Sequence, residues 1–514
     1  MQRARVARGA LYITVQNVAL YMIPLAFYAA LARILTQSET GEIPIFYLVM
    51  AVFTTITQLA VPVAATKFIS ENIGSGRAAT ASASARTALK LILAISIPSA
   101  LIGVIVSPWL SATVFGTPSE ALLLQVVVAT SLLLNLTTLI GACFMGLGLF
   151  GSVAIQNLVF FGTSRGLGVI LAWIGYRLTG VVAGFLLGSV ACLALSLALL
   201  RGKLPLANEK FPPRTLLAYS YPVWITMIVN IGQSWADSAI LYALTSSLAT
   251  LGVYYLISTG ATVISVLWTP VTTTMFPAMS AEYGKTGVQG IVNSFRRSTR
   301  VLNLTVIPLS LSLAAVSRTA ISVAYGPAYV IGAVPFVILT LATIMAAYSM
   351  LFSTALQAVG ETKAMMKIGV VSVAVELLLT ALLARPLSAT GAALARTAMF
   401  IVGVVLGYRV LSGKVRIAVD TGSIVRAAIF GAILATPLLA AEWVLTDVAP
   451  QPLPLILGVE GFLFLAVGLI VVKKWKPIEA QDLELIKEAL PRSLHKALDW
   501  LVSSSAEDQN GVEK

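Results

Sequence analysis

The stretch Ser70-Glu71-Asn72-Ile73-Gly74-Ser75-Gly76 recurs later in the chain as Ser280-Ala281-Glu282-Tyr283-Gly284-Lys285-Thr286-Gly287. Three further pairs repeat at nearly the same offset: Leu35-Thr36-Gln37-Ser38 with Leu244-Thr245-Ser246-Ser247, Gly146-Leu147-Gly148 with Ala358-Val359-Gly360, and Thr179-Gly180 with Thr390-Gly391. A near-constant offset of about 211 residues indicates an internal duplication, and repeats of this size in an apolar chain are how many transporters are built. We therefore predict two similar lobes.

The composition is that of a membrane protein. Of the 514 residues, 58% are hydrophobic and 11% are charged, and the mean hydropathy is +0.92. Charged residues make up about a quarter of an average soluble protein. Apolar runs of the length that an α-helix needs to cross a bilayer recur along the whole chain, and they predict an all-α polytopic membrane protein with about 14 transmembrane helices.

The expected spans have approximate edges. They are 9–32, 43–65, 87–108, 121–147, 151–174, 180–200, 215–243, 250–277, 301–323, 331–357, 364–385, 389–411, 422–446 and 453–473. The expected domains are a first six-helix bundle at 1–200, a cytoplasmic linker at 201–214, a second six-helix bundle at 215–411, two additional transmembrane helices at 412–473, and a cytoplasmic amphipathic tail at 474–514.

Lysine and arginine are distributed unevenly among the expected loops. One alternate set of loops, together with the two ends of the chain, holds roughly 28 of these residues, and the positive-inside rule places that set in the cytoplasm. The opposite set holds Arg33, Arg177, Arg318 and Arg385. Both termini are therefore expected to be cytoplasmic. Because each repeat has an even number of spans, the two bundles are expected to be related by a pseudo-two-fold axis along the membrane normal.

Several classes of protein are excluded by what the chain lacks. The two cysteines, Cys143 and Cys192, lie far apart in apolar runs, and His495 is the one histidine. This count excludes a disulfide scaffold and a Cys/His metal site, so neither a metal nor a cofactor is expected. The net charge of +13 is explained by membrane topology, and we expect no nucleic-acid partner.

Charged residues inside the expected spans are the candidates for function, because an ionisable group at the bilayer centre is costly and faces a bundle interior or a wet cavity. Four stand out, and Glu460 is a weaker fifth: Arg165, Asp237, Glu376 and Arg396. Two interpretations stay open, one being structural ion pairs between helices and the other a polar cavity for a charged or sugar-rich cargo. The repeat aligns Arg165 with Glu376, whereas Asp237 and Arg396 align with Phe27 and Phe185.

Polar residues also lie within or at the edges of spans, and their number favours a wet interior over helix packing alone. They are Gln16, Asn17, Gln58, Asn135, Gln156, Asn157, Asn230, Gln233 and Gln357.

An ordered set of loose motifs resembles a known family. The motifs are Ala32-Arg33-Ile34-Leu35 with Gly41, Pro62, Lys67-Phe68-Ile69-Ser70-Glu71, Asp237-Ser238-Ala239-Ile240-Leu241, Gly252-Val253-Tyr254, Phe276-Pro277, Tyr325-Gly326-Pro327-Ala328-Tyr329, Ala355-Leu356-Gln357-Ala358-Val359-Gly360 and Gly391-Ala392-Ala393. Over residues 5–475 the chain resembles the oligosaccharide-flippase branch of the multidrug/oligosaccharidyl-lipid/polysaccharide exporter superfamily. It departs from the family at Leu387-Ser388-Ala389-Thr390, where a tyrosine-glycine pair is common.

The resemblance implies two six-helix bundles that face each other across a central cavity, with two added C-terminal helices. It also implies a cargo, a polyprenyl-(pyro)phosphate-linked oligosaccharide that is flipped from the inner to the outer leaflet. A phosphate head group would favour a cationic lining, for which Arg165, Lys67 and Arg396 are candidates. Lys67, Arg33 and Asp237 match charged positions of the family at the ends of the first two spans and in the seventh span.

Three other functions agree less well with the sequence than a flippase does. A cation-coupled multidrug exporter of the same superfamily would prefer an acidic cavity without basic balance, and a lipid II flippase would resemble the chain less closely. A membrane-embedded glycosyltransferase or polymerase would need catalytic groups in a sizeable outer loop, and the outer loops are short and nearly uncharged. We expect a monomer in the cell membrane that contacts membrane lipids. Asp237 and Glu376 fit coupling to an ion or to the membrane potential.

Overall fold

The computed structural model describes residues 22–204, 209–415 and 420–475, and every regular element in these ranges is a helix. Ten of the helices are long and apolar enough to cross a membrane by length and composition. The predicted all-α polytopic membrane protein is therefore confirmed. Residues 9–21 of the first expected span and all but the first two residues of the expected tail lie outside the described ranges.

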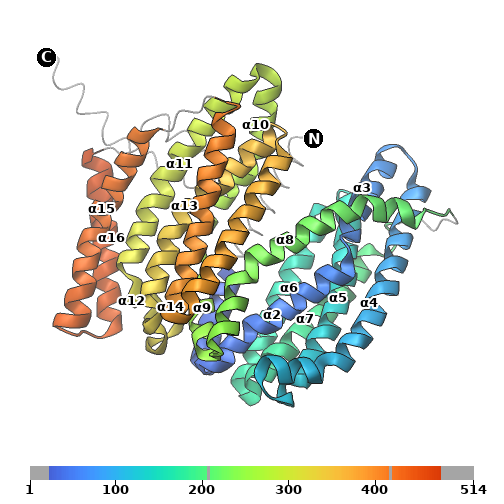
Figure 1. The fold of residues 1–514 in the computed structure, drawn as a ribbon, viewed down its shortest axis with the longest axis horizontal. Coiled ribbons are helices and arrows are strands. Elements are labelled where there is room, and N and C mark those ends of the chain that lie inside the picture. Colours follow the sequence, from blue (N-terminus) through green and yellow to red (C-terminus); the bar gives the residue numbers. More distant parts are fainter. Residues whose placement is uncertain (1–21, 205–208, 416–419, 476–514) are drawn as a thin grey trace. The chain divides into compact units, whose positions relative to one another are not determined.

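The described residues form two compact units. The first unit takes the residues up to Tyr242 together with Ser247–Gly252. Its helices are Met22–Ile34, α2 Gln37–Gln58, α3 Val61–Gly74, α4 Ala78–Phe115, η1 Pro118–Glu120, α5 Ala121–Gly146, α6 Phe150–Leu171, the π-helical η2 Ala172–Tyr176, α7 Arg177–Leu200 and most of α8 Pro213–Thr245 (Figure 1). Buried Ile69, Ile92 and Leu139 join α3, α4 and α5 in its core, and Leu216 adds α8.

The second unit takes Ala243–Ser246 and the residues from Val253 onward. Its helices are most of α9 Leu248–Ala261, η3 Thr262–Ile264, α10 Ser265–Thr286, α11 Val288–Ala315, α12 Ser317–Tyr325, η4 Pro327–Gly332, α13 Ala333–Ala358, α14 Thr362–Ser412, α15 Thr421–Trp443, the π-helical η5 Val444–Val448 and α16 Leu453–Trp475. Its core contains Phe295, Leu351 and Phe352. The last two helices, α15 and α16, lie side by side (Figure 1).

Local sequence signals set the helix boundaries. A capping box starts α2: Glu39 N donates to Thr36 Oγ1, and the Glu39 carboxylate accepts from Thr36 N. Each side chain thereby satisfies the backbone N–H of the other residue. At the start of α15, Asp420 Oδ1 accepts from Ser423 N at 3.0 Å. The chain leaves α4 through Gly116 at φ 73°, a conformation that glycine adopts without steric cost.

The duplication is present in the backbone geometry. Residues with positive φ occur in pairs separated by the repeat offset of about 211 residues: Gly76 with Gly287, Gly116 with Gly326, Gly148 with Gly360, and Arg177 with Ser388. The last pair is the most informative, because neither residue is glycine. Arg177 has φ 46° and ψ −129°, and Ser388 has φ 49° and ψ −130°. Both units therefore make the same unusual turn at the same place in the repeat.

This turn explains part of the difference between the fourteen predicted spans and the ten long helices, and the shorter apolar helices Met22–Ile34 and Leu248–Ile264 explain the rest. The continuous helical stretch Phe150–Leu200 contains the expected spans 151–174 and 180–200, and α14 contains the expected spans 364–385 and 389–411. The non-helical Gly175 bends the first stretch and Ser388 bends α14. The arrangement of twelve helices plus two, and the pseudo-two-fold axis, stay predictions.

The end of the expected linker is tied to the first unit. Thr80 Oγ1 donates to Glu209 Oε2 at 2.6 Å, and Thr87 Oγ1 donates to the Phe211 carbonyl at 3.0 Å. The following helix, α8, has most of its residues in the same unit. The expected domain boundaries stay predictions.

Candidate functional site

Arg165 lies on α6 of the first unit against aromatic rings. Its guanidinium carbon is 4.5 Å from the centroid of the Phe161 ring, one turn earlier on the same helix, and 5.9 Å from the centroid of Phe27. A guanidinium held within about 6 Å of a ring face is attracted by the ring quadrupole. The rings therefore stabilise the cation without neutralising its charge.

Further aromatic side chains from three more helices, α2, α7 and α8, lie around Arg165. Tyr47 of α2 packs on Phe185 of α7 with ring centroids 4.9 Å apart, and Phe185 is 6.3 Å from Phe27. On the other side, Tyr47 stacks on Trp235 of α8 at 6.4 Å and an interplanar angle of 23°. Tyr47 also interacts with Arg165. We call Arg165 with Phe27, Tyr47, Phe161, Phe185 and Trp235 the Arg165 aromatic cluster.

The charge of Arg165 is left uncompensated by acidic groups. Within the described ranges no carboxylate forms an ion pair with Arg165, and its buried Nε has no hydrogen-bond partner. A half-buried guanidinium of this kind retains donors for an anion, and planar paired donors suit phosphate. The cluster is thus equipped to bind an anionic group beside flat apolar rings.

In the second unit the predicted charges pair with each other. Arg396 Nε donates to Glu376 Oε1 at 3.2 Å, and the Glu376 side chain has 0% exposure against 17% for Arg396. Both residues belong to α14, and the bend at Ser388 lies between them. The bend folds the two halves of α14 together, so residues twenty positions apart in the chain become partners.

The other predicted site residues lie in different surroundings. Asp237 on α8 is fully buried, and its Oδ1 accepts from Ser238 N at 2.6 Å. Lys67 on α3 has its ammonium 4.6 Å from the ring centroids of both Phe68 and Tyr219.

The Lys67 ammonium also lies 3.8 Å from Glu71. Arg33 is exposed and donates to the Ala29 carbonyl at 2.7 Å. Neither residue belongs to the Arg165 aromatic cluster.

Glu460, the weaker candidate, takes part in a tie between helices. Thr319 N of α12 donates to Glu442 Oε1 of α15 at 2.9 Å, and Thr319 Oγ1 donates to Glu460 Oε1 of α16 at 3.1 Å. Both carboxyl groups belong to residues that are 5% exposed. The arrangement joins three helices through one threonine, which is a structural role.

The polar residues of the spans divide into two groups. Asn135 Nδ2 donates to Thr57 Oγ1 at 2.6 Å and its Oδ1 accepts from Gln58 Nε2 at 3.3 Å, in the buried interior of the first unit. Such residues join helices. By contrast, Asn230 and Gln233 on α8 are exposed. Gln16 and Asn17 lie outside the described residues.

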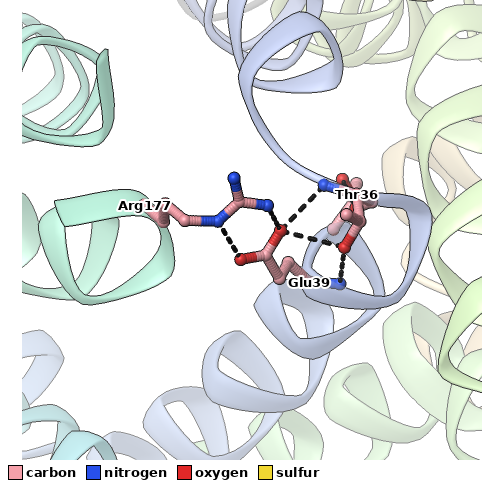
Figure 2. A network of polar contacts seen from close by, with 4 residues as sticks. Thr36, Glu39 and Arg177 are labelled. Atoms are coloured by element: carbon pink, nitrogen blue, oxygen red, sulfur yellow. Dashed lines mark hydrogen bonds and ion pairs between the residues drawn. The ribbon is translucent and has the colours of Figure 1, made fainter. Parts of the chain in front are cut away.

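One polar network was not expected from the sequence. Arg177, at the start of α7, binds Glu39 of α2 through two hydrogen bonds, of which Nε to Oε1 is 2.6 Å, and Glu39 also binds Thr36 (Figure 2). Both charges lie at the ends of helices, so the hydropathy pattern did not single them out. The Thr36-x-x-Glu39 spacing, typical of a capping box, was the available signal. The partners of Arg165 were missed too, because aromatic residues in apolar spans are common.

Comparison with known proteins gives a family and a fold. The profile of the family described as "Polysaccharide biosynthesis protein" matches residues 6–282. A protein of Haloferax volcanii named as a probable low-salt glycan biosynthesis flippase, Agl15, is 28% identical over 269 residues, which are 52% of this chain and 56% of that protein. The alignment thus spans little more than half of that relative.

Three solved structures share the fold. The lipid II flippase MurJ in an inward closed conformation has a TM-score of 0.68 at 13% identity and covers 89% of this chain and 98% of its own. An inward-facing multidrug resistance MATE family transporter has a TM-score of 0.60 at 15% identity, with coverage of 77% and 95%. A MOP superfamily transporter from Pyrococcus furiosus has a TM-score of 0.54 at 12% identity, with coverage of 84% and 96%.

Proposed function

Because the chain belongs to the polysaccharide biosynthesis protein family, we propose that it is a flippase for a polyprenyl-(pyro)phosphate-linked oligosaccharide. The lipid tail stays in the bilayer while the head group crosses by alternating access, and the product serves surface polysaccharide or glycoprotein glycan assembly. The all-helical membrane fold and the similarity to a probable glycan biosynthesis flippase support this assignment.

The observation that carries the proposal is the uncompensated charge of Arg165. A phosphate-linked head group needs a cation that is not already neutralised, and the Arg165 guanidinium has no acidic partner in the described ranges. Charge-assisted hydrogen bonds to phosphate are roughly twice as strong as neutral ones. Aromatic rings beside the guanidinium add flat apolar surfaces for the parts of the cargo next to the phosphate.

The protein works in this proposal as a monomer with both termini in the cytoplasm, and it transports rather than modifies the sugar. The distribution of Lys and Arg supports the orientation. The short outer loops support transport over glycosyl transfer, since they leave little room for a catalytic site. Lys67 lies in the middle of α3, just beyond the expected span 43–65 on the side that the positive-inside rule places in the cytoplasm. It is proposed to meet the head group on entry, and Arg33 to meet it on exit.

A cation-coupled multidrug exporter is the second candidate, favoured by the shared fold with MATE family transporters. The Arg165 aromatic cluster opposes it, because a permanent cation repels the cationic compounds that an acidic exporter cavity would attract. Drug tolerance therefore separates the two candidates: the flippase reading expects no change in tolerance to organic cations when the protein is absent.

Reconstitution tests the proposal directly. Proteoliposomes that contain the purified protein should move a fluorescent polyprenyl-pyrophosphate-linked oligosaccharide between leaflets faster than empty liposomes. In cells, disruption of the gene should leave lipid-linked sugars facing the cytoplasm. Normal surface glycans in the disruptant, together with no acceleration in proteoliposomes, would refute the proposal.

A further inference from the structure

Helix α8 exposes polar side chains although it is long and apolar enough to cross a membrane. Thr226, Asn230, Gln233 and Ser234 are all exposed or half-buried positions of its middle section, and none carries a charge. We call these four residues the α8 polar stripe. A membrane helix that turns such groups outward must meet water, protein or a polar ligand there, because lipid cannot satisfy them.

The stripe occupies one side of the helix. At about 100° per residue, Thr226, Asn230 and Gln233 fall within a sector of about 60°. The large exposed apolar residues of the same section, Ile225 and Ile228, fall on the far side of the helix from Asn230. The side of α8 opposite the stripe is therefore apolar, and the stripe itself suits a wet surface.

The side of α8 opposite the stripe also holds the helix in place, since Trp224 and Trp235 lie there at about 100° per residue. Trp224 Nε1 donates to the Thr55 carbonyl of α2 at 2.8 Å, and Trp235 stacks on Tyr47 of the same helix. Both contacts are made with α2, and α2 does not cover the stripe. The orientation of the stripe is therefore set by packing within the first unit.

The amides of the stripe are available to a ligand. Asn230 and Gln233 make no hydrogen bond to any residue in the part of the chain that the structure describes. Each amide offers two donors and one acceptor with two lone pairs. Neutral side chains that both donate and accept are complementary to sugar hydroxyl groups, which do the same, and they give no advantage to a charged group over a neutral one.

We propose that the α8 polar stripe is the glycan-contacting surface of the transport pathway, with Asn230 and Gln233 hydrogen-bonding to hydroxyl groups of a neutral sugar. The inference rests on the proposed function and assigns two parts of the cargo to two different surfaces of the first unit. Arg165 on α6 takes the phosphate, which every cargo of this class shares, while the stripe on α8 contacts the sugar. Substitutions in the stripe then alter recognition of the glycan and leave recognition of the carrier phosphate unchanged.

The test compares two ligands and two double variants. Calorimetry on the purified full-length protein measures binding of a polyprenyl phosphate linked to a neutral disaccharide and of the same polyprenyl phosphate without sugar. The variants are Asn230→Ala with Gln233→Ala, and as a matched control Gln289→Ala with Asn293→Ala, which removes two exposed amides from α11. Alanine raises helix propensity, so the variants are expected to fold, and a melting curve verifies this.

We expect the stripe variant to bind the disaccharide-linked lipid about tenfold more weakly and the sugar-free lipid as the wild type does, since two hydrogen bonds to the sugar are lost. The control should bind both ligands normally. Equal affinity of the stripe variant and the wild type for the disaccharide-linked lipid would overturn the inference, and so would an equal loss for both lipids. If the wild type binds neither lipid, the proposed function itself fails.

Discussion

The two halves of the chain repeat the same backbone and treat the equivalent charged position in opposite ways. In the first unit Arg165 is surrounded by rings, including Phe185 in its cluster, and has no carboxylate partner among the described residues. In the second unit the aligned position is Glu376, and the residue aligned with Phe185 is Arg396, which pairs with it at 3.2 Å. At equivalent positions, the first unit has a cation without an acidic partner among the described residues, and the second unit has a carboxylate that is paired with an arginine.

The comparison shows that the two halves can share a backbone turn and still carry different charged side chains. The turn at Arg177 recurs at Ser388 with nearly the same φ and ψ, so the chain bends at the same place in each repeat. The side chains brought together by that turn differ, and they decide whether the interior holds a free cation or a neutral pair. A free cation can bind a ligand, whereas a buried ion pair mainly holds helices in register.

The largest effect is expected when the charge pair is broken. Arg396→Ala should destabilise the protein by about 3 kcal/mol, because it removes a partner of a carboxylate that has no access to water. Unfolding in detergent micelles measures this. The control is Arg385→Ala, which removes an exposed arginine of the same helix.

Replacing both partners by methionine should recover much of the loss, since no buried charge then remains. If Arg396→Ala is as stable as Arg385→Ala, the pair is not structural and the contrast between the two halves is lost.

Removal of the open charge should affect transport rather than stability. Arg165→Ala is expected to slow flipping of the lipid-linked oligosaccharide at least about tenfold, the worth of one charged hydrogen bond. Its melting temperature should stay close to that of the wild type, because no ion pair is broken. Arg165→Lys should lie between the two, since lysine keeps the charge and loses the planar fork. If Arg165→Ala flips the cargo as fast as the wild type does, Arg165 is not the site that binds the anionic head group.

The rings around Arg165 should have a smaller effect. Phe161→Ala removes the ring nearest the guanidinium and should reduce flipping about three- to fivefold, in line with a cation–π contact of up to about 1 kcal/mol. Phe160→Ala is the matched control, because the Phe160 ring contacts Phe161 and lies over no cation among the described residues. Equal effects of the two substitutions would mean that the rings only fill space.

The shared turn should respond differently in the two halves. Ser388→Gly should stabilise the protein by up to about 1 kcal/mol, because glycine adopts positive φ without strain. Arg177→Gly gains the same relief but loses the bond to Glu39, so its net effect should be smaller (Figure 2). Melting curves of both variants check this order. A larger gain for Arg177→Gly would show that the Arg177–Glu39 contact contributes nothing.

The smallest effect concerns an ion pair of the second unit that the aligned residues of the first unit cannot form. Lys414 Nζ lies 2.8 Å from Glu361 Oε1, whereas the offset of 211 residues aligns these two positions with Lys203 and Phe150 in the first unit, so the lysine is repeated and the glutamate is not. The hydrogen bond and the charge of Glu361 raise the pKa of Lys414 above its usual value.

A raised lysine pKa means that the contribution is present below the unfolded-state pKa and is lost as pH rises through the folded-state pKa. Lys414→Met should therefore melt like the wild type at pH 7 apart from a slight decrease, and the difference should disappear at strongly alkaline pH. A difference between the two proteins that persists there would contradict the assignment.

Much of the fold was predictable from particular residues. The apolar runs indicated helices, and the structure has helices there. The recurrence of Gly148 as Gly360 indicated a duplication, and both glycines have positive φ. The positions of the two bends agree with the ends of the expected spans at 174 and 385, whereas the positive φ of Arg177 and Ser388 was not predictable, because neither residue type favours it. Each of these two pairs of expected spans is joined by a tight bend and has no longer loop between its members.

The sequence by itself determined which residues are too polar for lipid, since the energy of placing Arg165, Asp237, Glu376 and Arg396 in an apolar span depends on residue type and position alone. Only the tertiary structure decided which of them is neutralised. Coulomb and hydrogen-bond energies depend on distances in space, and these are set by how bent helices pack. The bend in α14 brought Arg396 to Glu376, while helices of the first unit brought rings instead of a carboxylate to Arg165.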